Sequence, residues 1–248
     1  MSGHSKWSTI KRKKGAADAK RGAAFTKLAH AISVAAREGG GDPDMNISLR
    51  MAIDKARAAN MPNANIVRSI KRGTGDLTGE AVPESVTYEA YGPGGVAVLV
   101  DCLTDNRNRT VSDVRAAVTK RGGSLGEAGS VGYLFGTKGI ITVPKEGIGE
   151  DELTLAAADA GADEVSGDGA SFEIETEREQ LASVRDALVK AGYPISTAEL
   201  AKVPTSEVPV VERKTAEAVV ALVTDLESLD DVTAVFTNAD IDPELVGG

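Results

Sequence analysis

The stretch Asp163-Glu-Val-Ser-Gly-Asp-Gly-Ala-Ser-Phe-Glu-Ile-Glu175 decides the fold of the middle of this chain. Two short runs with strand character, 163–166 and 171–175, flank Gly167-Asp168-Gly169, which is a typical hairpin turn. Around this hairpin the sequence predicts two helices and two outer strands, over residues 151–160, 178–191, 139–143 and 195–200. The resulting order, β-α-β-β-α-β, is that of a ferredoxin-like unit.

The segments on either side of this unit each contain part of a second α/β pattern. Before it lie two predicted strands, Ser85–Tyr91 and Val96–Leu103, and a helix that Thr110-Val-Ser-Asp113 opens as a capping box and that runs to Lys120. After it come a helix over 212–226 and a strand over 232–237. We expect residues 82–135 and 205–248 to pair into one α/β domain, with the ferredoxin-like domain, 136–204, inserted into it.

The N-terminal third has helical periodicity instead. A first helix, Ala17–Glu38, is ended by Gly39-Gly-Gly41, and a third covers Asn63–Arg72. Between them Asp42-Pro43 is expected to start a helix, with Asp42 as the N-cap. The apolar face of this second helix is formed by Met45, Leu49, Ala52, Ile53 and Ala56. The prediction is an α+β protein, with a flexible basic arm (1–15), a three-helix domain (16–76) and two α/β domains.

Charge is distributed very unevenly along the chain. Residues 1–75 contain fifteen Lys and Arg against five Asp and Glu, whereas residues 76–248 contain thirteen against thirty-two. The protein as a whole has a formal net charge of −9. One basic end on an acidic protein attracts a polyanion to that end and repels it from the rest, and nucleic acid is the polyanion that Lys and Arg most often bind.

Composition excludes several other classes of protein. Hydrophobic residues make up 42% of the 248 residues, which is typical of a folded, globular chain. The sequence has no apolar stretch of the length that crosses a membrane and no secretory signal, so no membrane partner is expected. Cys102 is the single cysteine, which fits a reducing compartment, and the cytoplasm is the expected location.

The basic arm supplies most of the candidate nucleic-acid contacts. Lysines and arginines there would bind phosphates, and Trp7 could stack on a base or anchor the arm. A solvated tail is the alternative, but the charge continues into the first helix. The predicted contacts in this part are Lys6, Trp7, Lys11, Arg12, Lys13, Lys14, Lys20 and Arg21.

Two further groups of cations are candidates, each with a structural alternative. Arg68, Lys71 and Arg72 end the third helix, where they could bind phosphate or simply complement the helix dipole. Arg107 and Arg109 stand just before the predicted helix from Thr110, where cations oppose the dipole. They could hold an anion at the helix N-terminus, or they could form ion pairs with the acidic part of the protein.

Catalytic patterns are largely missing from the sequence. The histidines are His4 and His30, no metal-ligand spacing occurs, and Cys102 lies in a predicted core strand as a small apolar residue. The glycine-rich segments 92–95 and 122–132 do not match phosphate-loop motifs and are interpreted as a turn and a flexible connection. We therefore expect a protein that is not an enzyme, with no cofactor, no metal and no small-molecule substrate.

Several longer motifs resemble those of the YebC family, whose mitochondrial branch includes the translational activator of cytochrome oxidase. The similar stretches span nearly the whole chain and are Met1-Ser-Gly-His-Ser-Lys-Trp7, Ala35-Ala-Arg-Glu-Gly-Gly40, Asn60-Met-Pro62, Ile70-Lys-Arg-Gly-Thr-Gly75, Tyr88-Glu-Ala-Tyr-Gly-Pro-Gly-Gly95, Leu103-Thr-Asp-Asn-Arg-Asn-Arg-Thr110 and Phe236-Thr-Asn-Ala-Asp-Ile-Asp242. The resemblance implies three domains and a non-catalytic cytoplasmic bacterial factor. It also implies either DNA-binding transcriptional regulation or RNA binding in translation on ribosomes stalled at proline-rich stretches.

The residues themselves leave DNA and ribosomal RNA open as the partner. Arm cations make phosphate-type contacts, which carry no sequence information. A DNA reader would usually show Arg, Asn or Gln along a recognition helix, whereas the third helix is short and its cations cluster at its end. An RNA reader would usually expose aromatic side chains, and Trp7 is the one candidate.

Overall fold

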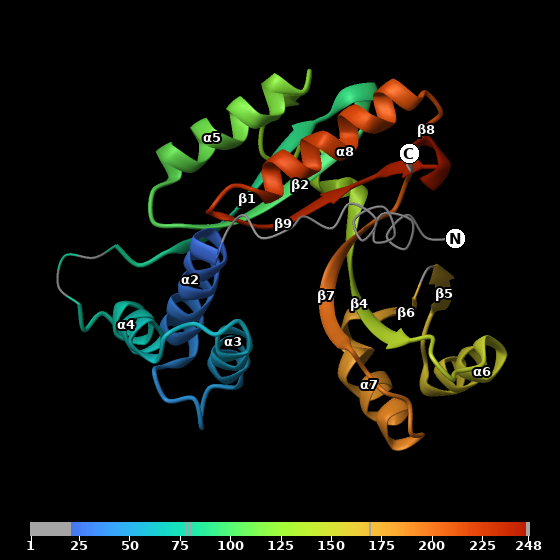
Figure 1. Ribbon diagram of the computed structural model, residues 1–248, viewed down its shortest axis with the longest axis horizontal. Coiled ribbons are helices and arrows are strands. Elements are labelled where there is room, and N and C mark those ends of the chain that lie inside the picture. The colour runs from blue at the N-terminus through green and yellow to red at the C-terminus, as the bar shows by residue number, and fades with distance from the viewer. Residues whose placement is uncertain (1–20, 78, 80, 169, 247–248) are drawn as a thin grey trace.

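A computed structural model describes residues 21–246 of the chain, except 78, 80 and 169. Its N-terminal part is the predicted helical domain, made of α2 (Arg21–Gly39), α3 (Ile47–Ala58) and α4 (Asn63–Thr74). Both α3 and α4 pack on α2 (Figure 1). The core between them contains Ile32, Leu49, Ile53 and Ile66, all nearly inaccessible to solvent. The predicted arm, 1–15, lies outside the described residues.

Helix α4 approaches α2 unusually closely, and Gly73 makes this possible. A Cβ atom at Gly73 would stand 2.2 Å from the carbonyl oxygen of Ser33 and 2.8 Å from the Cβ of Ala36. A hydrogen bond joins the two helices nearby: the Ser33 hydroxyl of α2 donates to the carbonyl of Ser69 in α4 at 2.9 Å. The position of α4 on α2 is therefore set by a backbone-to-backbone contact that a larger residue would prevent.

The predicted start of the second helix is wrong. Helix α3 begins at Ile47, with Asn46 as its N-cap, and Met45 is 83% exposed. The Asn46 amide does more than a cap usually does, because its oxygen accepts from the N–H of Leu49 while its nitrogen donates to the carbonyl of Ala35. Asp42 instead accepts from the N–H of Asp44 within the preceding turn. Asn46 is favoured as the N-cap because it hydrogen-bonds to a backbone carbonyl of α2 as well as to a backbone N–H of α3.

The α/β domain is built on a four-stranded sheet in the order β3-β1-β2-β9. Its strands are β1 (Glu84–Tyr91), β2 (Ala97–Thr104), β3 (Ser124–Leu125) and β9 (Val232–Thr237), with neighbours antiparallel. Helices α5 (Arg107–Lys120) and α8 (Arg213–Glu227) cover one face (Figure 1). Two short strands that the sequence did not predict, β8 (Val208–Val210) and β10 (Ala239–Ile241), form a separate parallel pair.

Each face of this sheet carries its own apolar cluster. Val98 and Val100 pack against α5 and α8, where Leu222 and Leu226 are fully buried. On the other face Leu99 packs with Val131, in the segment that leads into the next strand, and with Phe135, the first residue of that strand. Val96 to Thr104 is almost entirely apolar because β2 is an inner strand that is buried on both faces.

Helix α5 starts one turn earlier than the sequence predicted. Its N-cap is Asn106, whose side chain accepts from the N–H of Arg109, and the helix begins at Arg107. Thr110 is buried inside the helix and does not serve as a cap. The two arginines are thus in the first turn of α5, where cations still oppose the helix dipole, so the anion site at this helix N-terminus stays a prediction.

The inserted domain is ferredoxin-like, as predicted. Its order is β4 (Phe135–Pro144), α6 (Glu150–Ala160), β5 (Glu164–Asp168), β6 (Ser171–Glu177), α7 (Leu181–Lys190) and β7 (Thr197–Pro204). The strands form an antiparallel sheet in the order β5-β6-β4-β7, with α6 and α7 on one face (Figure 1). Phe135 pairs with Pro204, so the chain enters and leaves the domain at adjacent positions. The exact domain boundaries stay a prediction.

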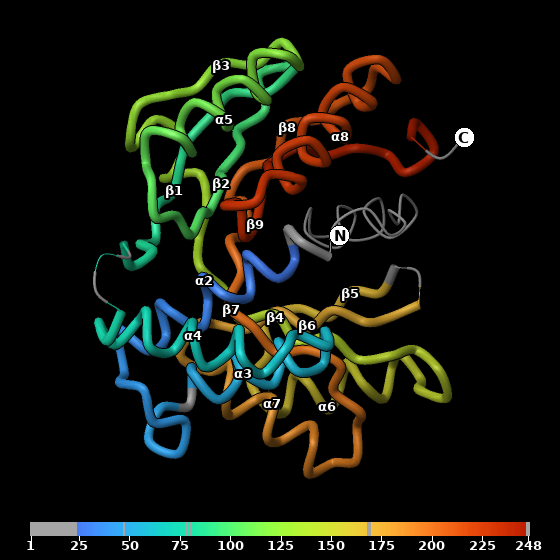
Figure 2. Tube along the Cα trace, turned by 60° about the vertical axis from the view of Figure 1, so that its left-hand side comes forward, coloured from blue at the N-terminus to red at the C-terminus, as the bar shows by residue number. Residues whose placement is uncertain are grey.

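The two smaller domains are attached to the α/β domain by different forces. The inserted domain contributes Ile140, Ala201 and Val203 to an apolar contact with Phe236 of β9. The described contacts of the helical domain are polar: the Lys27 ammonium donates to the carbonyl of Glu227 at 2.7 Å, and the His30 ring lies 2.8 Å from the carbonyl of Leu103. Both domains lie on the same side of the α/β domain (Figure 2).

The glycine-rich segment 122–132 is anchored by a carboxylate. The side chain of Glu89 accepts from the N–H of Gly129 at 2.7 Å, of Val131 at 2.6 Å and of Gly132 at 2.7 Å. Burial raises the pKa of Glu89, but these three hydrogen bonds outweigh it and leave the pKa below its ordinary value. The backbone N–H groups that could have bound a phosphate in this segment donate to the Glu89 carboxylate instead.

Replacing Glu89 with Gln should lower the free energy of unfolding by about 1–3 kcal/mol, because an amide NH₂ then faces N–H donors. In the wild type, the Glu89 contribution should be complete above the ordinary Glu pKa of about 4.3 and should be lost as the pH falls through the lowered folded-state pKa. Urea unfolding between acidic and neutral pH measures both effects. Glu127→Gln, in the same segment and exposed, is the control and should change stability by less than about 0.5 kcal/mol.

Candidate nucleic-acid interface

A groove of about 570 Å³ lies between α2 and α4. Its lining includes Phe25 of α2, Met61 from the α3–α4 connection, and Asn65, Arg68 and Arg72 from α4. Asn65 and Arg68 are exposed and lie one turn apart, so they point to the same side of the helix. Asn and Arg are the side chains that make bidentate contacts with adenine and guanine in the major groove of DNA.

Local sequence fixes where α4 begins and ends. Pro62 precedes it, and Gly75 ends it with a left-handed φ of 81°, a conformation that glycine adopts without strain. Lys71 and Arg72 fall in the last turn, where they complement the helix dipole. Lys71 is exposed, so this stabilising role leaves its ammonium accessible to a partner.

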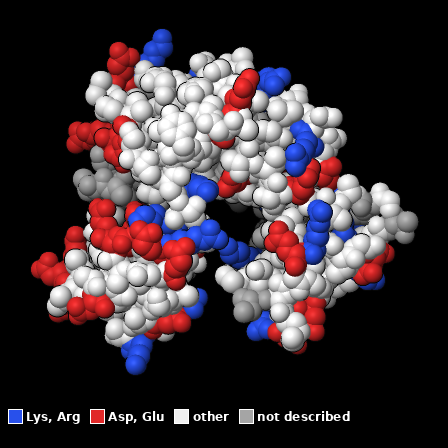
Figure 3. Space-filling view, turned by 180° about the vertical axis from the view of Figure 1, so that it is seen from behind, with Lys and Arg blue, Asp and Glu red and all other residues white. Residues whose placement is uncertain are grey.

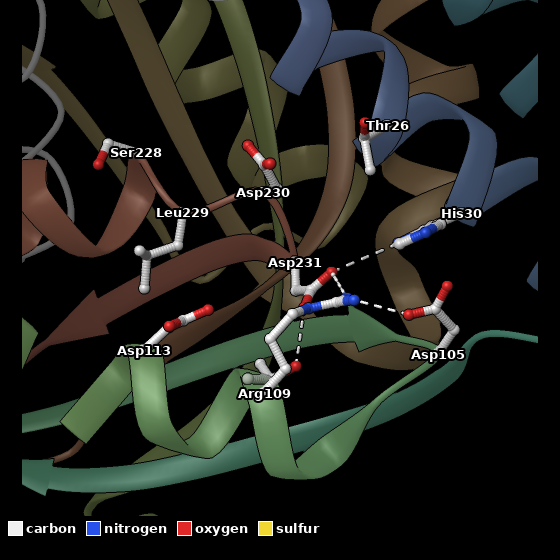
Figure 4. A pocket seen from close by; sticks show the side chains of 10 residues that line it. Thr26, His30, Asp105, Arg109, Asp113, Ser228, Leu229, Asp230 and Asp231 are labelled. Atoms are coloured by element: carbon white, nitrogen blue, oxygen red, sulfur yellow. Dashed lines mark hydrogen bonds and ion pairs between the residues drawn. The ribbon is translucent and has the colours of Figure 1, made fainter. Parts of the chain in front are cut away.

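Beside the groove, a network of charges joins the helical domain to the α/β domain (Figure 4). Its centre is Asp231, which follows α8 and is only 6% exposed. Arg109 donates to both of its oxygens, at 2.9 and 2.8 Å, and Thr110 donates to it at 2.7 Å. The Arg109–Asp231 hydrogen bonds raise the pKa of Arg109. Thr104 of β2 lies 3.2 Å from the same carboxylate, so α5 and β2 both contact the α8–β9 connection here.

The network continues to the helical domain through Asp105. This carboxylate accepts from Arg109 at 2.9 Å and from Arg72 of α4 at 2.7 Å. Burial raises the pKa of Asp105, and the two arginines more than compensate, so its pKa is lowered. His30 of α2 lies 4.0 Å from Asp231 as well, along one wall of a cavity of about 540 Å³.

The predicted contact residues therefore divide into three groups. Lys6, Trp7, Lys11, Arg12, Lys13, Lys14 and Lys20 lie outside the described residues, and Arg21 begins α2. Arg68 and Lys71 are exposed on α4. Arg72, Arg107 and Arg109 each pair with a carboxylate of the α/β domain, Arg107 with Glu84 at 2.9 Å. For these three, ion pairing within the protein, the alternative that the sequence left open for Arg107 and Arg109, accounts for the observed geometry.

Three residues of the network were not found by sequence reasoning: His30, Asp105 and Asp231. Asp231 is 121 residues away from its partner Thr110 in the sequence, so no local pattern connects them. The buried threonines Thr104 and Thr110 gave a weak signal, because polar residues at core positions need hydrogen-bond partners. Their partners are defined only when α5 and the α8–β9 connection are brought together.

The described part of the chain offers neither a reactive thiol nor a cluster of metal ligands. Cys102 is buried, and burial raises its pKa to about 12, so the thiol is protonated at neutral pH and a poor nucleophile. Among the described residues, no three His, Cys, Asp or Glu side chains are placed to hold a metal ion. None of the described helices has both the length and the apolarity needed to cross a membrane.

Charge is segregated between the domains in space as well as in sequence. Residues 136–204 carry fourteen Asp and Glu against six Lys and Arg. Acidic side chains gather on this lobe at the lower left of Figure 3, and a hollow separates it from the helical lobe. A polyanion would be repelled from the inserted domain and attracted to the helical end.

Two family models match this chain. Residues 5–76 match the TACO1/YebC protein N-terminal domain, and residues 83–239 match the TACO1/YebC second and third domain. A probable transcriptional regulatory protein from Thermobifida fusca is 53% identical over 99% of this chain and 98% of its own length. One from Rubrobacter xylanophilus is 52% identical, with the same shares covered.

A solved structure supports the same relationship. The crystal structure of a conserved hypothetical protein from Aquifex aeolicus is similar with a TM-score of 0.84 and 47% sequence identity, over 96% of this chain and 98% of the other. Matches to the family over both the helical domain and the α/β part, together with whole-length relatives near 50% identity, leave no other assignment: the chain belongs to the TACO1/YebC family.

Proposed function

We propose that this protein is a non-enzymatic regulator of gene expression that binds DNA in the cytoplasm through its basic N-terminal end. The observation that carries the proposal is the segregation of charge, fifteen cations against five acids in residues 1–75, on an acidic protein. The names of the relatives, probable transcriptional regulatory proteins, support DNA as the partner. In this proposal the arm and the exposed cations of α4 provide the phosphate contacts, and the exposed side chains Asn65 and Arg68 contact base edges.

The ferredoxin-like sheet has no part in this binding. In RNA-binding domains of this architecture the open sheet face stacks bases on aromatic side chains. Here that face presents glutamates, among them Glu173, Glu175 and Glu177 on β6, which repel phosphate. The helical end and the arm are thus the surfaces proposed to contact nucleic acid.

Charge reversal in the arm tests the proposal directly. Lys11→Glu combined with Lys13→Glu should weaken duplex DNA binding by about tenfold or more at 0.1 M salt, since two phosphate contacts become repulsive. The slope of log K against log salt should fall by about 1.8, or roughly 0.9 for each lost contact. Lys190→Glu, on α7 of the inserted domain, is the control and should leave both quantities unchanged. Equal affinities for all three proteins would contradict DNA binding by the arm.

The alternative partner is ribosomal RNA, in a protein that assists synthesis on ribosomes stalled at proline-rich stretches. Crosslinking in living cells, followed by sequencing of the attached nucleic acid, separates the two. Reads concentrated at a few promoter regions support transcriptional regulation. Reads concentrated in ribosomal RNA would replace it with the translation function, and the arm would then bind RNA phosphates.

A further inference from the structure

The face of the inserted sheet opposite α6 and α7 is acidic outside the patch where Ile140, Ala201 and Val203 pack against Phe236. Antiparallel pairing places one row of side chains across its four strands: Glu164 opposite Glu175, Glu175 opposite Ile140, and Ile140 opposite Glu199. Glu173 and Glu177 flank Glu175 on β6 and point to the same side. Helices α6 and α7 lie on the other face (Figure 1). We call Glu164, Glu173, Glu175, Glu177 and Glu199, together with Lys138, the acidic face.

Lys138 is the cation of this face, and three carboxylates surround it. Its ammonium lies 2.8 Å from Asp163, 2.7 Å from Glu177 and 3.7 Å from Glu175. The hydrogen bonds from Asp163 and Glu177 raise the pKa of Lys138 well above its ordinary value, which reflects the negative potential around it. Like charges directly opposite each other on neighbouring strands, as at Glu164 and Glu175, destabilise a sheet. A positively charged occupant would relieve that cost.

The chain's own N-terminus has the matching chemistry and leads out of α2. Lys6 and the run Lys11-Arg-Lys-Lys14 carry five positive charges. The first described turns of α2 lie against the α8–β9 connection, where Lys27 donates to the carbonyl of Glu227. From there β9 leads to Phe236, which packs against Ala201 and Val203 of the inserted domain. Lys14 lies seven residues before Arg21, a separation that an extended chain can span over about 23 Å.

We propose that the acidic face binds the basic segment 6–14 of the same chain, and that nucleic acid displaces this segment when it binds. The second part rests on the proposed function; the first does not. Glu173 and Glu175 each have an interaction partner, and docking of the segment requires no vacant carboxylate. Self-docking would screen the arm from weak, nonspecific polyanions, because a ligand must outcompete the acidic face.

Trp7 is the single tryptophan and lies within the docked segment, so its fluorescence reports docking in the intact protein without nucleic acid. Its steady-state anisotropy should be high in the wild type and should fall as salt is raised to about 0.5 M. Glu164→Lys with Glu173→Lys should lower the anisotropy to the level of a free peptide of residues 1–20. Adding Lys11→Glu and Lys13→Glu to that variant should restore at least half of the loss.

A control with the same charge change lies on the other side of the same domain. Glu152→Lys with Asp159→Lys alters two exposed acids of α6 and should leave the Trp7 anisotropy unchanged. An unchanged anisotropy in the acidic-face variant would overturn the proposal, as would an equal fall in the α6 control. Circular dichroism shows whether each variant remains folded, and the charge-swapped variant tests the pairing independently of any change in stability.

Displacement by nucleic acid is measured separately. If the arm is docked in about 90% of molecules, releasing it should strengthen DNA binding by about tenfold. The acidic-face variant should therefore bind a duplex about tenfold more tightly than the wild type. Equal affinity would overturn the displacement step. Absence of binding by every variant would instead refute the proposed function, while the fluorescence result on docking would stand.

Discussion

Replacing Asp231 with Ala should lower the free energy of unfolding by about 3–4 kcal/mol, which is the largest effect expected of a single polar substitution in this protein. The carboxylate is buried and accepts from Arg109 and Thr110, and the Thr104 hydroxyl lies 3.2 Å away. Its removal leaves a guanidinium and two buried hydroxyls without their shared acceptor. Because Arg109 is about half exposed, at 47%, water compensates part of the loss, and the effect stays below the upper range for buried pairs.

The neighbouring residue provides a matched control. Asp230 lines the same cavity but is exposed, so Asp230→Ala should change stability by less than about 0.5 kcal/mol. Urea unfolding followed by circular dichroism measures both variants. If Asp231→Ala and Asp230→Ala were equally mild, the charge network would not hold α5 and the helical domain to the α8–β9 connection.

Replacing Gly73 with Ala should destabilise the helical domain by about 2–3 kcal/mol, although the same change in an open helix would stabilise it. Alanine is favoured over glycine inside a helix by about 1 kcal/mol. Here the added methyl would stand 2.2 Å from the carbonyl oxygen of Ser33, and backbone cannot move aside as a side chain can. Helix α4 must shift away from α2, which also displaces Asn65 and Arg68.

The direction in which Gly73→Ala shifts the stability distinguishes a tight α2–α4 contact from a loose one. Thermal unfolding of Gly73→Ala should show a lower midpoint than the wild type, whereas a higher midpoint would mean that α4 has room beside α2. Val67→Ala, at a position on the same helix that is 44% exposed, is the control and should have a small effect. DNA affinity should also fall in Gly73→Ala if α4 contributes to the interface, and stay near the wild-type value in Val67→Ala.

Much of the architecture could be predicted from local patterns. The hairpin around Gly167-Asp168-Gly169 and the helical periodicity on either side gave the ferredoxin-like order, and the strand order β5-β6-β4-β7 confirms it. The helix starts were predicted less well. Asn46 and Asn106 are the N-caps of α3 and α5, where the sequence favoured Asp42 and Thr110. A capping motif shows that a helix can begin at a residue, but tertiary contacts select among the nearby possibilities.

The sequence by itself determined the charge segregation, the helical and ferredoxin-like patterns and the family motifs, because these depend on composition and on periodicities within short windows. Only the tertiary structure decided what the arginines do. Arg72 and Arg109 share Asp105, and Arg109 reaches Asp231, which is 122 residues away in the sequence. The strength of an ion pair depends on distance and burial in space, and local sequence specifies neither.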